Sequence, residues 1–418
     1  MRLLRTWGII AFTAGLSACR KNAVTSELPV SPTIGTRTQF TLDSIYLYAK
    51  QIYLWSDALP SYTAFDPRKY ASDPVALNAF NTELFDISQL KVNPQTGLKY
   101  EEPVNPGSPK YSFITDLNAN GELAAVGAPT LGAVLKDTVI GKNIGYVALG
   151  SFPELSTCKD AVDAAFSKLA AANSQQLVVD LRYNGGGFVE TAEYVANLIA
   201  PSALGGKVMF SERYNALLQA SNASILKNQT YYDANGKTVI YKGRTANLAD
   251  VDYTEAGNTH KFSKKGELET VKDIYFITSS ATASAAELLI SSMKPYFNVK
   301  LVGGTTYGKP VGFFPVKIDV YRVYLSSFLI RNAQGWSDYF QGIPADVQVA
   351  QGDDPPLGDP NEACLSAVLG LTNGASLSTV QQQANDKKVQ SASIFKSNAG
   401  TIRVPIGMIE NRLKLKDN

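Results

Sequence analysis

Residues 271–304 have the sequence VKDIYFITSSATASAAELLISSMKPYFNVKLVGG. The apolar, β-branched and aromatic run at 271–278 predicts a buried strand. Residues 284–296 predict a helix with Ala285, Leu288 and Leu289 on one face, and the run at 299–304 predicts a second strand that ends on glycines. A strand, a crossover helix and a second strand indicate parallel pairing, so both strand ends should reach the same edge of the sheet.

A third predicted strand arrives at that edge. Residues 176–187, QLVVDLRYNGGG, form an apolar run that ends on Asn184 and three glycines, and a helix is predicted over about 189–199. Glycines let backbone N–H groups turn outward without a Cβ clash. Such groups near a helix start are suited to stabilising an oxyanion. The sequence therefore predicts an α/β core whose site lies at the carboxyl edge of the sheet, where open α/β sheets bind ligands.

Ser284 and Lys309 are the candidate catalytic pair, because each follows one of the two strand ends at 271–304. The chain contains one histidine, His260, in a polar run that predicts a loop away from any junction between strand and helix. A lysine is therefore the expected acceptor of the serine proton. Each residue also has a plainer interpretation. Ser284 and Glu287 fit a helix capping box, and Lys309 fits a solvated loop.

Three motifs in this region resemble those of the C-terminal processing, or tail-specific, peptidases, a family of serine–lysine peptidases. They are the run Asp180–Gly187, the element Ser284-Ala285-Ala286-Glu287 and the loop Thr306-Tyr307-Gly308-Lys309. The stretch GIPADV at 342–347 also resembles the segment that closes the family's core, and the similarity covers roughly residues 141–370. The resemblance implies a ClpP/crotonase-like α/β core.

The same resemblance implies an activity and assigns residues to it. The chain would be a serine-type endopeptidase that hydrolyses exported or misfolded polypeptides through an acyl-enzyme intermediate. Ser284 would be the nucleophile and Lys309 the general base. The backbone N–H groups of Ala285 and of one loop glycine, Gly186, would hold the oxyanion.

This mechanism makes a demand on the surroundings of Lys309. An unperturbed lysine titrates near ~10.4, so work near neutral pH requires its pKa to fall by about three units. Burial is the physical means of such a depression. The sequence therefore predicts an apolar, water-poor site around the amine, to which Tyr307, Val311 and Phe313 are candidate contributors.

Two departures from the family favour a second hypothesis. Phe313 stands where many members carry a glutamine that is thought to orient the lysine. The stretch 96–142 is too short for the PDZ domain that usually precedes the core. Since one fold can serve different functions, the alternative is a non-catalytic peptide- or ligand-binding protein on the same scaffold.

The first residues indicate export. Arg2 and Arg5 precede an apolar run at 7–16 that is followed by Ser17-Ala18-Cys19, a pattern typical of a secretory signal and too short to span a bilayer. The ending resembles a bacterial lipobox, which implies that Cys19 is lipidated and anchors the protein to a membrane. Because no aspartate follows Cys19, the outer membrane is the implied location. An ordinary signal peptide is the alternative.

Composition limits the partners and cofactors. The formal net charge is +2, and no arginine-rich run predicts nucleic-acid binding. We expect no cofactor and no metal, since no cluster of histidine, cysteine and carboxylates has metal-ligand spacing. Cys158 and Cys364 are expected to be two buried thiols, with a disulfide as the less favoured possibility. The oligomeric state is not indicated.

These observations divide the chain into six predicted parts. They are a lipoprotein signal peptide at 1–18, a tether at 19–40, a helical region at 41–95, a short connecting region at 96–142, the peptidase core at 143–371 with an insertion at 205–270, and a C-terminal tail at 372–418. Further predicted elements are helices at 41–59, 74–85, 158–171 and 360–371, a strand at 144–149, paired strands within 316–330, and a hairpin at 230–241 that turns at Asn235-Gly236.

Overall fold

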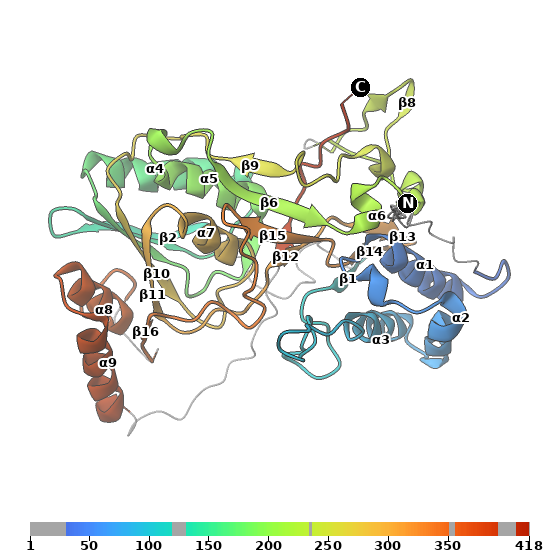
Figure 1. The fold of residues 1–418 in the computed structure, drawn as a ribbon, viewed down its shortest axis with the longest axis horizontal. Coiled ribbons are helices and arrows are strands. Elements are labelled where there is room, and N and C mark those ends of the chain that lie inside the picture. The colour runs from blue at the N-terminus through green and yellow to red at the C-terminus, as the bar shows by residue number, and fades with distance from the viewer. Residues whose placement is uncertain (1–30, 119–130, 234–235, 351–355, 392–406, 418) are drawn as a thin grey trace, which may run out of the picture.

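The computed structural model describes residues 31–118, 131–233, 236–350, 356–391 and 407–417 (Figure 1). The predicted signal peptide and Cys19 lie outside the described residues. Among the described residues, none of the helices is both long enough and apolar enough to span a membrane.

The N-terminal region is helical, as predicted. Its α-helices are α1 (Arg37–Ile52), α2 (Tyr62–Phe65) and α3 (Ala76–Ser88). The helix predicted at 41–59 is α1, and it begins before residue 41 because Thr36 caps it within the predicted tether. It ends before residue 59 because Tyr53 has extended backbone angles. The apolar face of α1 is buried and packs against α3.

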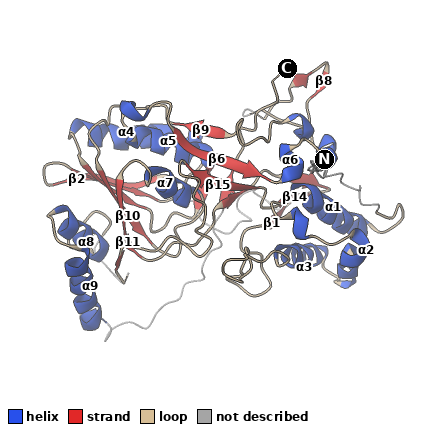
Figure 2. Ribbon diagram, viewed as in Figure 1, coloured by secondary structure: helices blue, strands red, loops and turns tan. Residues whose placement is uncertain are grey.

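A six-stranded sheet lies in the left half of the view in Figure 2, on the other side from the N-terminal helices. Its order is β16 (Val347–Gln348), β11 (Asn298–Gly303), β10 (Asp273–Thr278), β4 (Gln176–Asp180), β3 (Ile144–Leu149) and β2 (Val134–Ile140). All neighbours are parallel except β2 and β3. The predicted strands at 144–149, 271–278 and 299–304 are confirmed, as is the one within 176–187, which ends at Asp180. The mixed α/β class is confirmed too. The predicted convergence of β4, β10 and β11 at one edge is also correct.

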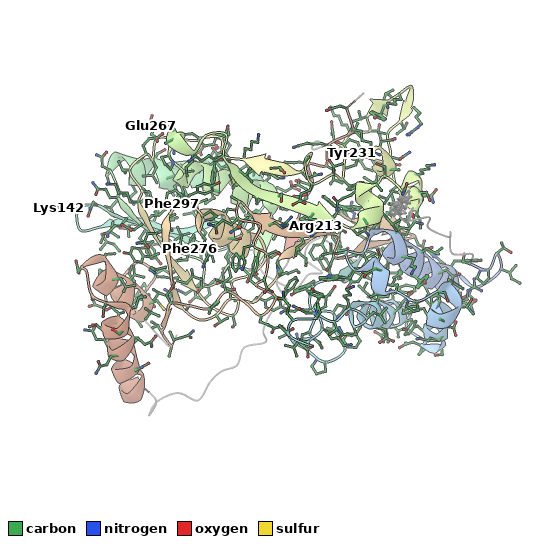
Figure 3. The ribbon with its side chains drawn as sticks, viewed as in Figure 1. Lys142, Arg213, Tyr231, Glu267, Phe276 and Phe297 are labelled. Atoms are coloured by element: carbon green, nitrogen blue, oxygen red, sulfur yellow. The ribbon has the colours of Figure 1, made fainter. Side chains whose placement is uncertain are left out.

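Helices cover both faces of this sheet. On one side lie α4 (Leu155–Ala171), α5 (Val189–Ile199) and α7 (Ala285–Met293), and on the other lie α8 (Ala363–Thr372) and α9 (Leu377–Ser391) (Figure 1). Successive strand residues point to opposite faces, so Phe276, labelled in Figure 3, belongs to one buried apolar cluster and Ile277 to the other. The helix α9 was missed, because its polar sequence lacks an apolar stripe.

Cys158 and Cys364 are both buried, on the α4 side and the α8 side of the sheet respectively. They are not joined in a disulfide. The expectation of two buried thiols is therefore confirmed.

A second sheet extends the core. It contains β12 (Val311–Gly312), β15 (Phe328–Asn332), β6 (Val208–Tyr214) and β9 (Thr259–Lys261). His260 therefore lies on a strand, and the predicted loop at this position is wrong. The polar composition of this segment is misleading because β9 is an edge strand whose histidine faces other polar side chains.

Two smaller groups of strands complete the fold. The predicted pairing within 316–330 is correct for β13 (Val316–Ile318) and β14 (Tyr321–Tyr324), which form a sheet with β1 (Phe113–Asp116), whereas Phe328 starts β15 in the second sheet. In the predicted hairpin Tyr232 bridges Thr238, although Asn235 lies outside the described residues. The paired strands there are β7 (Ile240–Tyr241) and β8 (Arg244–Thr245).

A C-terminal strand returns to the core. The strand β17 (Gly407–Ile409) pairs in parallel with β5 (Gly186–Phe188), at the glycine loop that follows β4. From the sequence, this stretch is recognisable only as a short apolar run near the C-terminus. Its pairing brings the C-terminal segment, residues 407–417, to the edge where the candidate site lies.

Candidate active site

Ser284 occupies a strained turn between β10 and α7. Its backbone angles are φ 62° and ψ −116°, a conformation that costs a non-glycine residue of order 1–3 kcal/mol. The surrounding turn is held by hydrogen bonds to the glycine-loop segment, since Thr282 Oγ1 donates to Leu181 O at 2.8 Å and Ala283 N donates to Asn184 O at 3.0 Å. Such strain is typical of functional positions, and it could not be read from the sequence.

Glu287 joins the serine turn to the lysine loop. Its buried carboxylate accepts hydrogen bonds from the backbone N–H groups of Ser284 at 2.8 Å, Gly308 at 2.7 Å and Lys309 at 2.8 Å, and from Thr306 Oγ1. The carboxylate half of the predicted capping box is thus present. The role of Glu287 in holding Lys309 was missed, although its position three residues after Ser284 was the available signal.

Lys309 is completely buried among apolar and backbone groups. Its Nζ lies 4.7 Å from the centre of the Phe313 ring and donates to Tyr111 O at 3.4 Å. Burial lowers the pKa of Lys309 to about 7, although the charges of Glu101 and Glu287 act in the opposite direction. The water-poor surroundings that the sequence predicts are therefore present. Phe313 contributes to them as expected, whereas Tyr111 comes from the connecting region and was missed.

Two paired glycines lie beside the serine and the lysine. A Cβ on Gly186 would lie 2.8 Å from Ser284 Cβ, and a Cβ on Gly407 would lie 2.9 Å from Lys309 Nζ. Gly186 and Gly407 are partners in the β5–β17 ladder. The serine therefore lies beside one glycine of the pair and the lysine amine beside the other, and a side chain on either glycine would clash with its neighbour. Ser284 Oγ is buried and has no hydrogen-bond partner, so it is not bonded to Lys309 Nζ in this arrangement.

The two candidate oxyanion donors differ. Ala285 is the first residue of α7, where backbone N–H groups have no acceptor within the helix. Gly186 N–H instead donates to Asn184 Oδ1 at 2.9 Å. The predicted free donor at Gly186 is therefore not found here, because Asn184 is buried and held by a bond from its Nδ2 to Leu149 O, which aims its oxygen at the glycine.

A buried ion triad anchors the glycine loop. Arg182 donates to both oxygens of Glu362, at 2.7 and 2.8 Å, and also to Asp180. Glu362 in turn accepts hydrogen bonds from the first N–H groups of α8. The resemblance pointed to Asp180 and Arg182 as part of a motif, and the structure gives them a positioning role between β4 and α8.

The C-terminal segment covers the pair. Phe313 N donates to Met408 O at 2.9 Å, and Glu410 N donates to Phe313 O at 3.1 Å, so β17 lies between β5 and Phe313. Ser284 and Lys309 each have an exposed fraction of 0%. The site as described is closed.

Ser284 and Lys309 thus both follow strands at the carboxyl edge of a buried, mostly parallel sheet. Residues 143–349 match the model of Peptidase family S41. This part of the chain belongs to that family, and the resemblance noted in the sequence is confirmed.

Individual relatives give the extent of the likeness. The carboxy-terminal processing protease CtpA of Bacillus subtilis (strain 168) is 27% identical over 167 residues, which is 40% of this chain and 26% of the length of that curated relative. Among solved structures, a lipoprotein from Streptococcus agalactiae is 16% identical with a TM-score of 0.46, and the photosystem II D1 C-terminal processing protease is 15% identical with a TM-score of 0.44. Each match covers 76% of this chain and 94% of the other.

Proposed function

We propose that this protein is a serine-type endopeptidase that hydrolyses exported or misfolded polypeptides through Ser284 and Lys309. The observation that carries the proposal is the buried Lys309 amine. Its pKa of about 7 lets it accept a proton near neutral pH, and its Nζ lies beside Gly407, the strand partner of the glycine next to Ser284. Family membership and the strained backbone at Ser284 support the same function.

The reaction proceeds in two halves. Lys309 Nζ takes the proton of Ser284 Oγ–H while Oγ forms a bond to the peptide carbonyl carbon. The ammonium then gives this proton to the departing amine as the C–N bond breaks, which leaves an acyl-enzyme. In the second half Lys309 takes a proton from water, the hydroxide attacks the ester carbon, and Ser284 recovers the proton.

Oxyanion stabilisation falls to backbone amides. Ala285 N–H at the start of α7 is the donor that this arrangement leaves available. Gly186 N–H becomes a second donor if its bond to Asn184 breaks when substrate binds. Ser284 Oγ must also rotate into hydrogen-bond reach of Lys309 Nζ in the substrate complex.

The experiment combines covalent labelling with digestion of an unfolded protein. We expect a fluorophosphonate probe to form an adduct on Ser284, identified by mass spectrometry, and the purified protein to cleave reduced casein. Ser284→Ala and Lys309→Ala should both abolish labelling and cleavage. Ser280→Ala is the matched control, because Ser280 is an exposed serine on the same turn, and it should behave like the wild-type protein. Equal cleavage by wild type and Ser284→Ala would refute the dyad.

A non-catalytic binding protein is the second candidate. The observations that favour it are the missing hydrogen bond at Ser284 Oγ, the aromatic ring at Phe313 and the strand that covers the pair. A folded wild-type protein that neither reacts with the probe nor cleaves casein, yet retains an unfolded polypeptide on a column, would establish this alternative.

The proposal includes the location and layout of the chain. We infer an exported lipoprotein anchored through Cys19 to the bacterial outer membrane, with a core at 143–371 and no PDZ domain in 96–142. The signal-like sequence at 1–18 supports this. Cys19→Ser should move the protein from the membrane fraction to the soluble fraction and remove the lipid mass from the N-terminal peptide. Unchanged fractionation would contradict it.

A further inference from the structure

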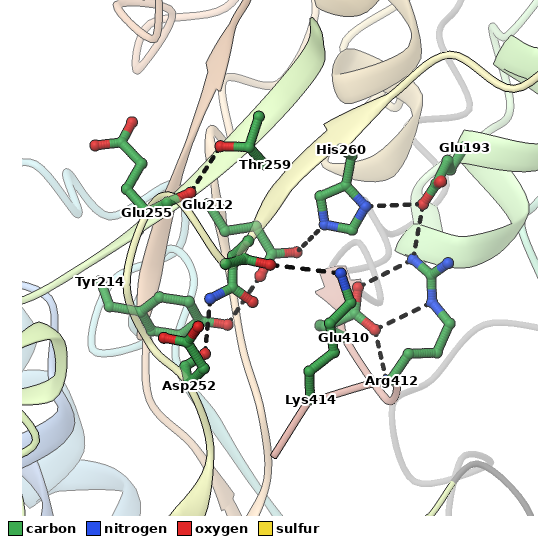
Figure 4. A network of polar contacts seen from close by, with 12 residues as sticks. Glu193, Glu212, Tyr214, Asp252, Glu255, Thr259, His260, Glu410, Arg412 and Lys414 are labelled. Carbon is green, nitrogen blue, oxygen red and sulfur yellow. Dashed lines mark hydrogen bonds and ion pairs between the residues drawn. The ribbon is translucent and has the colours of Figure 1, made fainter. Parts of the chain in front are cut away.

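We propose that Glu212, His260 and Glu410 form a binding site for a divalent transition-metal ion of the Zn²⁺ type. The three residues come from β6, β9 and the C-terminal segment, and each offers a ligand atom within 4.8 Å of the other two. They are outside the Ser284–Lys309 pair, so the site stands independently of the proposed peptidase function. Figure 4 shows them converging around the imidazole ring of His260.

The imidazole is oriented as in a metal ligand. His260 Nδ1 lies 3.0 Å from Glu193 Oε2, and the ring stacks on Phe210 with its centroid 4.3 Å away. A carboxylate on one ring nitrogen is the usual outer contact of a metal-binding histidine, because it fixes the tautomer and leaves the other nitrogen's lone pair available. Here the nitrogen left available is Nε2, and it faces Glu212.

The spacing between His260 and Glu212 suits a bridging ion. Nε2 and Glu212 Oε1 are 3.7 Å apart, which is too long for a hydrogen bond. Two atoms that bind one tetrahedral Zn²⁺ at about 2.0–2.1 Å lie roughly 3.3–3.4 Å apart. The observed gap is therefore close to that of two ligands on one ion.

Glu212 carries a buried oxygen that needs a partner. Its side chain is fully buried, and Oε2 accepts a hydrogen bond from Tyr214 at 2.8 Å. Oε1 has no hydrogen-bond partner and faces the cluster (Figure 4). A buried unpaired carboxylate oxygen is costly, and coordination to a cation would remove that cost.

The charge of the cluster also favours a cation. Three carboxylates, Glu193, Glu212 and Glu410, meet around His260, and the adjacent guanidinium is that of Arg412. It contacts Glu193 at 3.0 Å and Glu410 at 3.1 Å. A divalent ion bound beside a neutral imidazole would, together with Arg412, balance the three carboxylates in their ionised form. A carboxylate has about four acceptor positions, so Glu410 can keep Arg412 and still bind the ion.

The donor set selects the metal. An imidazole nitrogen with carboxylate oxygens suits Zn²⁺ and related transition metals, whereas Mg²⁺ prefers oxygen ligands alone. Three protein ligands leave a fourth position for water. Since Glu410 directly follows β17, a bound ion would fasten the C-terminal segment to the sheet of β6 and β9.

The test is calorimetric titration of tag-free full-length protein with ZnCl₂ and, separately, with MgCl₂. We expect one Zn²⁺ per chain and no detectable Mg²⁺. His260→Ala and Glu212→Gln should weaken Zn²⁺ binding by at least about 100-fold. Glu193→Gln, which alters the outer contact of His260 and the ion pair with Arg412 but removes no ligand atom, should weaken it by about 10- to 100-fold. Glu255→Gln is the matched control and should bind as the wild type does, because Glu255 bonds to Ser211 and Arg331 outside the cluster.

A second measurement remains decisive if a variant fails to fold. The chain has one histidine, so the imidazole nitrogen signals of selectively ¹⁵N-labelled wild-type protein report on His260 alone. Zn²⁺ should shift the Nε2 signal and leave Nδ1 in its hydrogen-bonded form. Absence of Zn²⁺ binding by the wild type, an unshifted Nε2 signal, or unchanged affinity in folded His260→Ala would each overturn the proposal.

Discussion

Burial controls the chemistry of Lys309. The amine has a backbone carbonyl, an aromatic ring and a glycine around it, and these groups offer an ammonium ion little compensation for lost water. In the proposed reaction only the neutral amine can take the proton of Ser284. The protonation state of this one residue should therefore govern the activity.

The pH dependence of Ser284 labelling follows from the pKa of Lys309, which burial lowers to about 7. Below that pH the amine is protonated, so the labelling rate should rise about tenfold per pH unit up to about pH 7 and then level off. The measurement is the rate of probe incorporation between pH 5 and pH 9. A flat profile, or a rise centred near the ordinary lysine value of ~10.4, would show that Lys309 is not the base.

Lys309→Met should stabilise the protein near neutral pH. The unfolded lysine holds its proton up to about pH 10.5 and the folded one only to about pH 7, so between these values the unfolded state binds more protons and stability rises with pH. Methionine removes this penalty, which is about 3–5 kcal/mol at and below pH 7. The denaturant midpoint of the variant should exceed that of wild type at pH 6–7, with a difference that shrinks towards pH 10. A variant less stable than wild type at pH 6 would contradict the account.

Among the helices and strands, those that are long and apolar could be predicted from the local sequence. The strands β3, β4, β10 and β11 and the helix α5 could be predicted because each is a continuous buried run beside a glycine or a helix start. The strands β9 and β17 could not. They have three residues each, and their pairing depends on β6 and β5, which lie far away in the sequence.

The same limit applied to the candidate sites. Ser284, Ala285, Lys309 and the glycine loop carry recognisable motifs, but Tyr111 touches Lys309 from a connecting segment that has none. Glu212, His260 and Glu410 are separated by 48 and 150 positions (260 − 212 and 410 − 260). No spacing rule relates residues so distant, and only the paired strands bring them together.

Glu287 connects two elements, and Glu287→Gln tests that connection. In the wild type, three backbone N–H groups donate to the two carboxylate oxygens of Glu287. A glutamine replaces one of these oxygens with an NH₂ group, which cannot accept a hydrogen bond. At least one buried donor would lose its partner, so we expect a loss of about 2–4 kcal/mol in stability and no labelling of Ser284. Glu267→Gln, on the surface (Figure 3), should change neither quantity. Full labelling in Glu287→Gln would mean that the lysine loop does not depend on this carboxylate.

Arg182 connects β4 to α8, as Glu287 connects the serine turn to the lysine loop. Replacing it with methionine leaves Asp180 and Glu362 buried without their cation, at a cost of about 3–5 kcal/mol. Thermal and denaturant unfolding should both report this loss. Arg244→Met is the matched control, since the guanidinium of Arg244 is half exposed where it pairs with Asp250. Water screens such a surface pair, so the loss of stability should be much smaller. Similar losses in the two variants would remove the reason for treating the triad as the anchor of the glycine loop.

Across the whole molecule, the C-terminal segment ties distant parts together. It pairs with β5, bonds to Phe313 and then runs along the insertion, where Asp252 N donates to Lys414 O and Lys416 N to Asp250 O. Because this segment lies beside the buried Ser284 and Lys309, we expect that it must move before a polypeptide substrate can reach them. Opening of the segment is therefore a step of the proposed reaction, and its cost should limit the rate.

Arg412→Ala should make opening easier. Arg412 holds the segment to α5 through Glu193 and neutralises Glu410, so its loss removes charge-assisted bonds and leaves the carboxylates to repel each other. A change of one to two kcal/mol corresponds to a roughly 5- to 30-fold shift in the open population, and Ser284 labelling should accelerate by that factor. Lys414→Ala is the matched control, because Lys414 is exposed and its Nζ makes one long contact, at 3.4 Å, with Gly257 O. If folded Arg412→Ala reacts no faster than Lys414→Ala, the segment does not limit access to the serine.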